Sequence, residues 1–401
     1  MNSLKNPIIS GKEILRRLID NGYDAYFVGG FVRDFLLSIE SSDIDLTTSA
    51  KPEEIKALFP NAISTGERYG TLTIPFEGSL YEVTTFRTEG EYLDARHPKF
   101  VAYTLDLSED LKRRDFTINA LAMDINGRII DQFNGQSDLE AKIIRAIGNP
   151  DTRFKEDALR MMRAFRFVSK LGFEIEPKTF ESISINKALL IEIANERIMQ
   201  ELKLILSGKH ALKSLKLMHK AQLGTVLKPI MSGLNWIVQQ KEYHLSGLEF
   251  MALSFYLNNR EFPEEWRFSN HDRTIIERLM DLVTVTQKDP FNELLVYVNG
   301  LELSLMANRI SNALDPTRDQ SILINKLYQQ MPIHKTCDLS FKGQDILSLG
   351  LVKDARIIGD LIDDITYQVI TLQISNTYEA IKDFVINKLK NGTTTGANYG
   401  K

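Results

Sequence analysis

The chain has 401 residues, of which 43% are apolar and 25% charged, so it can bury a sizeable core and has the length of roughly two to four domains. Its single cysteine, Cys337, excludes a disulfide framework and a four-thiolate zinc site within one chain. No apolar run approaches the ~20 residues that span a bilayer, and no signal peptide is seen, so we expect a cytoplasmic protein. The net charge of −4 gives no general reason to expect RNA binding.

The first part of the chain, to about residue 145, mixes helix and strand patterns. Helices are predicted at residues 11–20 and 31–38, and strands at 25–28, 43–49, 71–76 and 80–86. The charged stretch 89–99 has no clear period and is predicted to be a loop.

From about Asp151 the pattern is helical almost throughout, and it includes a helix over 153–172 that ends at Gly172. The last helix is predicted to end near Leu389, before a disordered tail at 391–401. The predicted fold class is therefore α+β, in which an N-terminal mixed sheet with helices precedes an all-helical remainder.

Two glycines, Gly29 and Gly30, lie where the predicted strand at 25–28 gives way to a helix. Glycines allow backbone amides to approach an anion closely, and a helix N-terminus adds partial positive charge. Arg33, one turn into this helix, can clamp a phosphate with its side chain. A lone Gly-Gly pair more often marks a plain tight turn, so a phosphate site needs further support from the neighbouring residues.

An Asp-x-Asp pair, Asp43 and Asp45, lies about a dozen residues further along the chain. In a strand these side chains point to one face while Ile44 points into the core. Two carboxylates on one face repel unless a cation joins them, and Mg²⁺ prefers such ligands together with substrate phosphates. A lone Asp-x-Asp is more often a solvated loop, but the glycine turn before it favours nucleotidyl transfer. Glu82, on a neighbouring predicted strand, is equally well a third catalytic carboxylate or an edge-strand charge.

The string GGFVRDFLL…DIDL resembles the motif of the polymerase-β-like nucleotidyltransferases, specifically the class II tRNA nucleotidyltransferases and the related bacterial poly(A) polymerases. The resemblance covers at least residues 24–206, with several motifs in order. It implies a catalytic head at 1–145, a base-recognising neck at 146–207, a helical body at 208–310 and a helical, tRNA-binding tail at 311–401.

The segment Lys112–Ala120 (KRRDFTINA) is similar to the family's ribose and triphosphate motif. The resemblance implies that Arg114 holds phosphate and that Asp115 accepts from the ribose hydroxyls. It also places Asp34 and Asn119 among the nucleotide-binding residues. Without the resemblance, an Arg-Arg-Asp string is simply the end of a surface helix with an internal ion pair.

The segment Glu156–Arg163 (EDALRMMR) resembles the family's base-recognition motif. On a helix Asp157 and Arg160 are neighbours at i, i+3, and they offer an acceptor beside a donor. Cytosine and adenine both present an amine beside a ring-nitrogen acceptor, whereas guanine and uracil reverse both contacts. Each unpaired buried polar group costs about 1–3 kcal/mol, so GTP and UTP are rejected. In isolation the pair is more simply a surface salt bridge.

The arginine series continues with Arg163 and Arg166, which resemble further nucleotide-binding positions. The apolar residues between them fit a helix core: Leu159, Met162 and Phe167.

Three other segments match the family less specifically. Residues 89–99 match the loop that helps the switch from CTP to ATP, although Asp94-Ala95-Arg96-His97 replaces the usual Asp-Gly-Arg-Arg. Asp131–Gly135 (DQFNG) resembles the Asp-x-x-x-Gly motif that links head and neck, and alone it is an ordinary turn. Glu196-Arg197 and Glu201 resemble a structural motif of the neck helices.

A row of lysines lies in a stretch, 202–241, that contains no Asp or Glu. Its members share one face of a predicted helix and are Lys209, Lys213, Lys216 and Lys220. A solvated face is the common explanation for such a row. The absence of acids favours contact with the phosphates of tRNA, which would make binding sensitive to salt.

The residues and the resemblance together predict attack of the tRNA 3′-hydroxyl on the α-phosphate of CTP or ATP, with Mg²⁺ as cofactor and pyrophosphate as leaving group. Three alternatives stay open. A poly(A) polymerase or an enzyme that adds only A shares most of these motifs. A non-catalytic RNA-binding protein is expected to have lost one metal carboxylate, and both Asp43 and Asp45 are present.

Overall fold

The computed structural model describes residues 7–41, 43–90, 92–94, 97–98, 101–352 and 354–390. The chain divides into two units, one formed by Met1–Tyr243 with Phe262–Arg267 and the other by His244–Glu261 with Phe268–Lys401. The first unit thus contains the predicted head and neck and the start of the predicted body. The predicted four-part division itself stays a prediction.

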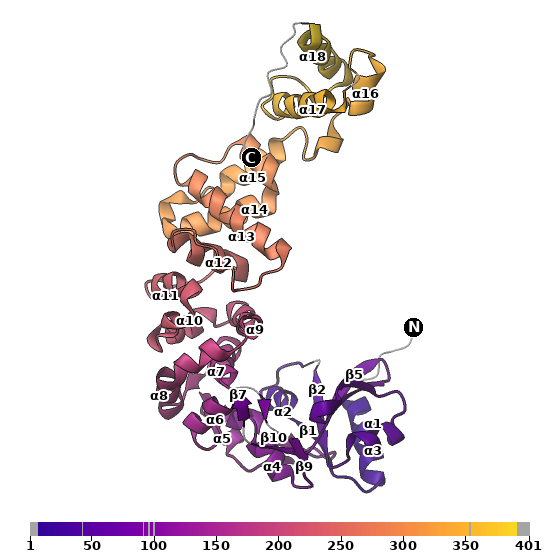
Figure 1. The fold of residues 1–401 in the computed structure, drawn as a ribbon, viewed down its shortest axis with the longest axis vertical. Helices are drawn as coiled ribbons and strands as arrows, with labels where there is room; N and C mark the ends of the chain where they lie inside the picture. The colour runs from indigo at the N-terminus through magenta and orange to yellow at the C-terminus, as the bar shows by residue number, and fades with distance from the viewer. Residues whose placement is uncertain are drawn as a thin grey trace. The chain divides into compact units, whose positions relative to one another are not determined.

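A mixed sheet forms the N-terminal part of the first unit (Figure 1). Within the described residues it has seven strands, in the order β11-β10-β1-β2-β5-β4-β3. The strands are β1 (Ala25–Val28), β2 (Ile44–Thr48), β3 (Ile63–Gly66), β4 (Thr71–Phe76), β5 (Ser79–Thr85), β10 (Leu121–Met123) and β11 (Ile129–Asp131). β2 and β5 are parallel and the other neighbours antiparallel, which confirms the predicted mixed sheet.

Short helices cover this sheet. They are α1 (Pro7–Asp20), α2 (Gly30–Leu36), α3 (Pro52–Leu58), α4 (Leu107–Lys112) and α5 (Gly135–Glu140). α1 and α3 lie side by side against it (Figure 1). The spacing of Ile14, Leu15 and Leu18 gives α1 one apolar face, and all three side chains are fully buried.

The predicted loop at 89–99 is wrong in part, because short strands run through this region. Backbone pairing joins β6 (Arg87–Glu89) to β9 (Val101–Tyr103), and β7 (Tyr92–Asp94) to β8 (His97–Pro98). Strand pairing uses backbone groups, so a polar sequence without a clear period can still form a ladder. Ala95 and Arg96 lie outside the described residues.

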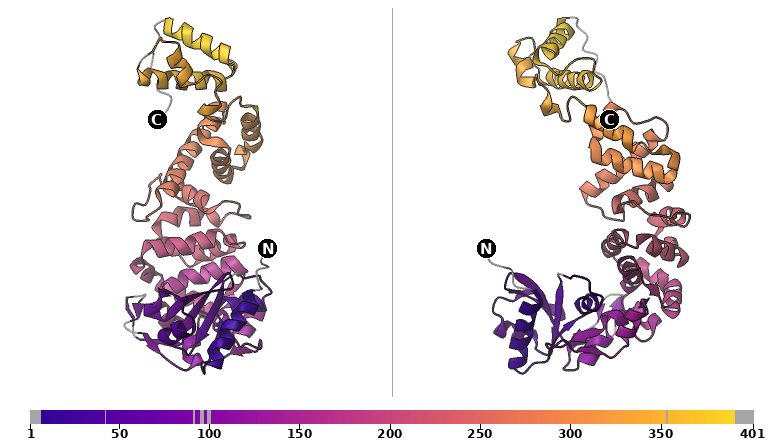
Figure 2. Two further views of the ribbon diagram at one scale, coloured as in Figure 1. Left: turned by 90° about the vertical axis from the view of Figure 1, so that its right-hand side faces the viewer. Right: turned by 180° about the vertical axis from the view of Figure 1, so that it is seen from behind.

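Helices make up most of the rest of the first unit. They are α6 (Pro150–Glu156), α7 (Leu159–Leu171), α8 (Pro177–Asn186), α9 (Asn195–Leu206), α10 (Ala211–Lys220) and α11 (Met231–Ile237). Two short strands, β12 (Ile143–Ile144) and β13 (Glu174–Ile175), pair between them. α7 packs against both α9 and α10, in the magenta part of the ribbon in Figure 2.

The helix predicted over 153–172 is broken near its start. Asp157 has an extended backbone (φ −140°, ψ 103°), and its carboxylate accepts a 3.1 Å hydrogen bond from the Leu159 amide. Asp157 therefore ends α6 and caps α7, as aspartate often does at a helix start. The predicted stop at Gly172 is confirmed, because this residue adopts the left-handed conformation that glycine allows.

The second unit is helical. Its helices are α12 (Gly247–Leu257), α13 (Asn270–Thr286), α14 (Glu293–Leu314), α15 (Ser321–Gln330), α16 (Gly343–Ser348), α17 (Ala355–Ile370) and α18 (Tyr378–Lys390). α18 ends within a residue of the predicted end at Leu389, and the predicted tail at 391–401 lies outside the described residues. In the part of the chain that the structure describes, none of the helices combines the length and apolarity that crossing a membrane requires.

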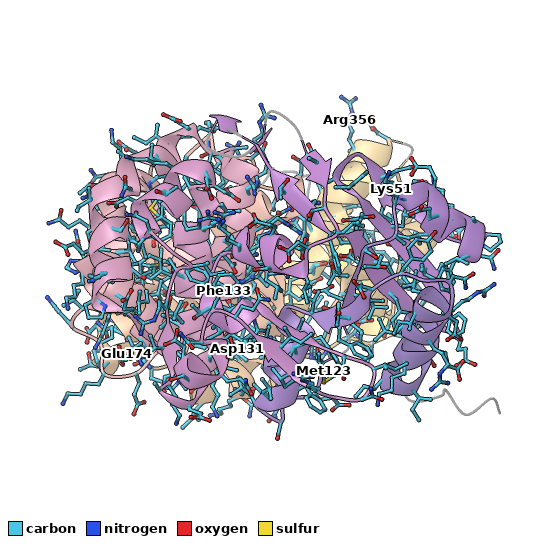
Figure 3. The ribbon with its side chains drawn as sticks, turned by 90° about the horizontal axis from the view of Figure 1, so that it is seen from below. Lys51, Met123, Asp131, Phe133, Glu174 and Arg356 are labelled. Atoms are coloured by element: carbon cyan, nitrogen blue, oxygen red, sulfur yellow. The ribbon has the colours of Figure 1, made fainter. Side chains whose placement is uncertain are left out.

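The turn at Asp131–Gly135 holds the start of α5 within the head. Figure 3 labels Asp131 and Phe133 in this turn. The Asp131 carboxylate accepts from the amides of Gly135 at 2.8 Å and Gln136 at 2.9 Å, which holds the start of α5. A Cβ on Gly135 would lie 2.3 Å from the carbonyl oxygen of Thr117. Only glycine fits this approach between α5 and the segment that carries Asn119.

We expect Gly135→Ala to lower the free energy of unfolding of the first unit by about 1–3 kcal/mol, because backbone must move to admit the methyl group. Thermal unfolding followed by calorimetry measures the change. Gly359→Ala is the matched control, since a Cβ on Gly359 in α17 meets nothing within 4 Å. An unchanged transition for Gly135→Ala would show that α5 does not need glycine at this approach.

Candidate active site

A cavity of about 1190 Å³ in the first unit brings together most of the predicted site residues. Those that line it are Gly29, Gly30, Arg33, Asp43, Asp45, Arg114, Asp115, Asn119, Asp157, Arg160, Arg163, Arg166 and Lys209. They come from the glycine turn after β1 and the following α2, from the start of β2, from the segment after α4, from α7 and the junction before it, and from the turn between α9 and α10. Asp34, Glu82, Lys213, Lys216 and Lys220 are not among the lining residues.

The glycine turn brings a cation and an anion against the backbone. Gly29 has φ 69°, and a Cβ there would lie 2.9 Å from Arg114 Nη1 and 3.7 Å from Asp45 Oδ2. Glycine is therefore required both by the backbone conformation and by the close approach of these side chains. Both glycines of the turn line the cavity, beside the Arg114 guanidinium that could pair with an anion there.

The two predicted metal carboxylates both face the cavity. Ile44 is buried between them, as predicted, while Asp43 is exposed just before β2 begins. Asp45 pairs in register with Glu82 across the parallel ladder of β2 and β5. Burial raises the pKa of Asp45 to about 6; Arg114 opposes this rise, and the carboxylates of Glu82 and Asp43 add to it. A buried carboxylate beside two others, only partly offset by arginine, is an environment that a divalent cation relieves.

Glu82 lies at the edge of this group. Its side chain is exposed, and it stands beside Asp45 without lining the cavity. Within the described ranges, no three acidic, histidine or cysteine side chains form a ready-made metal cluster. The structure therefore leaves Glu82 as a neighbour of the carboxylate pair.

Asp115 is buried at the centre of a hydrogen-bond network. Its Oδ1 accepts from the Phe116 amide at 2.8 Å and from Asn119 Nδ2 at 2.9 Å, and its Oδ2 accepts from Arg163 Nε at 2.6 Å. Asn119 in turn accepts from Arg33 Nη1 at 2.6 Å. Burial would raise the pKa of Asp115, but Arg163, Asn119 and the Phe116 amide outweigh it and lower the pKa to about 2. The carboxylate predicted to meet ribose is thus already engaged by protein donors.

A second buried carboxylate holds the adjacent arginines. Asp110 Oδ1 accepts from Arg113 at 2.9 Å, and Asp110 Oδ2 lies 3.3 Å from Arg114 Nη2. Burial works to raise the pKa of Asp110, but the two guanidinium groups hold it below its usual value. The buried Nε of Arg114 has no hydrogen-bond partner among the described residues, so this cavity-lining cation keeps a donor for a ligand.

Asp34 does not line the cavity, but it binds two residues that do. Its carboxylate accepts from Arg33 Nε at 2.8 Å and from Lys170 Nζ at 2.9 Å. It therefore joins α2 of the head to α7 and fixes the Arg33 side chain. Sequence patterns did not single out Lys170, because it lies 136 residues from Asp34.

The predicted base-recognition pair lies at the junction of α6 and α7 rather than on one helix. Arg160 is 7% exposed and donates to Glu156 at 2.6 Å and to the Arg113 carbonyl at 2.9 Å. Asp157 lies 3.7 Å from Arg197 Nη2. Both side chains line the cavity, each held by a partner other than the one predicted from i, i+3 spacing.

The predicted burial of Leu159, Met162 and Phe167 is confirmed, and Leu159 and Phe167 line the cavity as well. Sequence patterns did not single out other lining residues, which include Tyr69, Arg87, Lys170, Gln200 and Leu204. Glu201, expected to be structural, lies 3.2 Å from Arg166 Nη1, and its Oε2 is buried without a partner in the described part of the chain. Burial raises the pKa of Glu201, against the lowering effect of Arg166.

Three of the four lysines in the predicted row contact the protein itself. Lys213 donates to the Gly172 carbonyl and lies 2.6 Å from Glu174, while Lys216 donates to the Gln240 carbonyl at 2.6 Å. Lys220 lies 5.3 Å from the centroid of the Phe180 ring. Lys209 lies in the turn before α10, so the predicted single helix face is wrong for this residue, and it is the member of the row that lines the cavity.

Comparison with known proteins assigns the class. The family described as Poly A polymerase head domain matches residues 25–145, which include the glycine turn and both aspartates. The family "Probable RNA and SrmB- binding site of polymerase A" matches 172–234, and "tRNA nucleotidyltransferase domain 2 putative" matches 246–385. Fold and site thus define a nucleotidyltransferase.

Proteins that match nearly the whole chain narrow the assignment from nucleotidyltransferases in general to one family. The CCA-adding enzyme of Lactobacillus helveticus is 37% identical over 96% of this chain and 98% of its own, and that of Bacillus cytotoxicus is 36% identical over 93% and 96%. A crystal structure of the Bacillus stearothermophilus CCA-adding enzyme in complex with CTP matches with a TM-score of 0.84 and 32% identity, over 97% of this chain and 99% of that chain. The chain belongs to the family of CCA-adding enzymes, which are tRNA nucleotidyltransferases. This confirms the predicted fold class and enzyme class.

The low pKa of Asp115 makes a prediction about stability and pH. Because the folded pKa of about 2 lies below the unfolded value, the carboxylate stabilises the fold above about pH 4 and loses that effect as the pH falls toward 2. The shift corresponds to about 2 kcal/mol. The free energy of unfolding, measured with urea between pH 5 and pH 2, should therefore fall more steeply with decreasing pH in the wild type than in Asp115→Asn. In Arg163→Met the carboxyl titration of Asp115, followed by NMR, should move to higher pH; an unmoved titration would contradict the assigned cause.

Proposed function

We propose that this protein adds C, C and A in turn to the 3′ end of tRNA, using CTP and ATP and releasing pyrophosphate. The observation that carries the proposal is the meeting of a carboxylate pair, a glycine turn and a set of arginines in one cavity. The relative whose structure holds CTP supports the choice of nucleotide. In this mechanism the tRNA 3′-hydroxyl attacks the α-phosphate in line, and the reaction takes place in the cytoplasm, where tRNA and both nucleotides are present.

Asp43 and Asp45 are the residues that hold the metal, which we propose to be Mg²⁺. Their carboxylates face the cavity, and the raised pKa of Asp45 reflects burial and neighbouring negative charge that a cation offsets. When bound, Mg²⁺ lowers the pKa of the attacking hydroxyl and neutralises charge on the transferring phosphate. Glu82, in register with Asp45, is proposed as a third carboxylate that adds to the negative field.

The triphosphate lies against the glycine turn and the arginines. The backbone at Gly29 and Gly30 approaches the phosphates, and Arg33 and Arg114 supply side-chain donors, with the unpartnered Nε of Arg114 among them. Asp34 keeps Arg33 in place. Arg163 and Arg166 extend the positive surface along α7.

Asp115 and Asn119 are proposed to favour ribonucleotides over deoxyribonucleotides. Because Asp115 already accepts from Arg163, a ribose hydroxyl is bound by exchange with one of these protein donors. Asp157 and Arg160 provide the acceptor and the donor that match cytosine and adenine and mismatch guanine and uracil. Both groups line the cavity, so they can contact the base of the bound nucleotide directly. Selection of the base then needs no template strand.

A tRNA transcript lacking CCA tests the reaction directly. With CTP and ATP together we expect three added nucleotides, with CTP alone two, and with GTP or UTP none. Asp43→Ala should lose transfer by at least a thousandfold because the metal ligand is removed, while its affinity for tRNA stays within about twofold. A sequencing gel and a filter-binding assay give the two readouts.

Asp24→Ala is the matched control, because Asp24 is an aspartate beside the same sheet that does not line the cavity. It should keep full transfer. A long ladder of A would assign the activity of a poly(A) polymerase instead, and addition limited to A on a tRNA ending in CC would assign an A-adding enzyme. Unchanged transfer by Asp43→Ala would overturn the metal assignment.

The lysine row is proposed to contact tRNA phosphates, with Lys209 closest to the cavity. Changing all four lysines to glutamate should raise the Michaelis constant for tRNA at least tenfold and flatten its dependence on salt, because phosphate contacts release counterions. Lys209→Glu alone should produce a substantial part of this rise, since Lys213 and Lys216 are engaged with carbonyl groups. Steady-state kinetics at 50 and 200 mM salt measure the effect, and an unchanged Michaelis constant would remove the row from the tRNA site.

A further inference from the structure

The aromatic ring of Phe167 is in contact with three arginine side chains. The guanidinium carbons of Arg33, Arg163 and Arg166 are 5.1, 5.6 and 4.9 Å from the centroid of its ring. The side chain is 3% exposed and lines the cavity. All three distances fall in the range of cation–π interactions, in which the electron-rich face of the ring attracts the cation.

Each arginine is also held from its other side by a polar partner. Arg33 donates to Asp34 and Asn119, Arg163 donates to Asp115, and Arg166 lies 3.2 Å from Glu201 Oε1. The phenyl ring is thus the contact that all three guanidinium groups share.

These cations repel one another. Burial lowers the pKa of Arg166, and the charges of Arg163 and Arg33 lower it further, against Glu201 and Asp115. A small aliphatic side chain in place of the ring would keep the arginines apart but offer them no attraction. The aromatic face supplies a neutral group that draws three like charges together.

The ring of Phe167 also packs against a second aromatic ring. Phe116, next to Asp115 in the chain, makes an edge-to-face contact with it, with centroids 5.7 Å apart and an interplanar angle of 85°. Edge-to-face packing of this kind favours one ring orientation. The three guanidinium groups therefore contact a ring whose orientation is favoured by a neighbour of Asp115.

We propose that Phe167 is a positioning residue for the triphosphate, whose ring face sets the directions in which Arg33, Arg163 and Arg166 present their donors to it. Arginine binds phosphate through a planar fork, so its orientation matters as well as its charge. This inference rests on the proposed nucleotide site. It assigns to Phe167 a role in anion binding beyond the core packing that its hydrophobicity suggests.

Fluorinated phenylalanines separate this role from packing, because fluorine weakens the attraction of the ring face for cations while nearly preserving its shape. Phe167 is replaced in the full chain by 4-fluoro-, 3,4,5-trifluoro- and pentafluorophenylalanine. Calorimetry then measures the dissociation constants of inorganic tripolyphosphate and of CTP. Both should rise stepwise with fluorination, reaching about tenfold for the pentafluoro ring, while the Michaelis constant for tRNA stays unchanged.

The same series at Phe180 is the matched control, because that ring stacks on Lys220 and does not line the cavity. It should leave both dissociation constants unchanged. Phe167→Tyr, which keeps the aromatic face, should bind tripolyphosphate within about threefold of the wild type, whereas Phe167→Leu should bind at least tenfold more weakly. Melting temperatures identify any variant that fails to fold. If one fails, the dissociation constants of the 4-fluorophenylalanine and tyrosine variants are compared with those of the wild type.

The outcomes separate the two proposals. If the wild-type chain binds neither tripolyphosphate nor CTP, the nucleotide site itself is wrong. If the wild type binds both and the fluorinated series at Phe167 shows no trend, the site stands and the positioning role of Phe167 is overturned.

Discussion

The site depends on one chain of hydrogen bonds, which runs from Arg33 through Asn119 and Asp115 to Arg163. It joins α2, directly after the glycine turn, to α7 in the helical part of the same unit. Arg33, Asn119 and Asp115 are buried, so loss of one leaves a charge or a polar group without a partner, which is costly in a low-dielectric interior. The pair of Lys170 and Asp34 is a second tie between the same two helices. The glycine turn and the arginines of α7 are therefore held in a fixed relation, as phosphate binding at several points requires.

Pairing of charges explains how such a cavity exists before a ligand binds. Arg163 is paired with Asp115, Arg160 with Glu156, and Arg166 with Glu201. Isolated cations at these largely enclosed positions would face a large desolvation penalty, which the carboxylates offset. The chain can thus carry a net charge of −4 and still concentrate arginines where a polyanion is proposed to bind. In the proposed mechanism the nucleotide therefore binds partly by exchange with carboxylates that already hold arginine donors, and partly to donors without a partner, such as Arg114 Nε.

Sequence patterns predicted the parts of this arrangement that are local. Alternation and glycine turns located the main strands, and Gly172 ended its helix as expected. The motifs and the lysine row together selected thirteen of the residues that line the cavity. What they could not supply were partners distant in sequence, such as Lys170 for Asp34 or Gln240 for Lys216. Helical spacing states which face a side chain shares, but it does not say which carbonyl or carboxylate the fold brings opposite.

The junction at Asp157 shows why such local errors matter for function. Helical spacing made Asp157 and Arg160 a pair that points the same way, but the backbone breaks there and Asp157 turns its carboxylate to the Leu159 amide and toward Arg197. The two groups are consequently set by different neighbours, Arg197 for the acceptor and Glu156 for the donor. Discrimination among bases in the proposed mechanism then depends on several protein hydrogen bonds around the pair, on the order of 1 kcal/mol each. A base that matches the pair compensates for the bonds it displaces, whereas a base that reverses both contacts does not, and selection without a template follows from that difference.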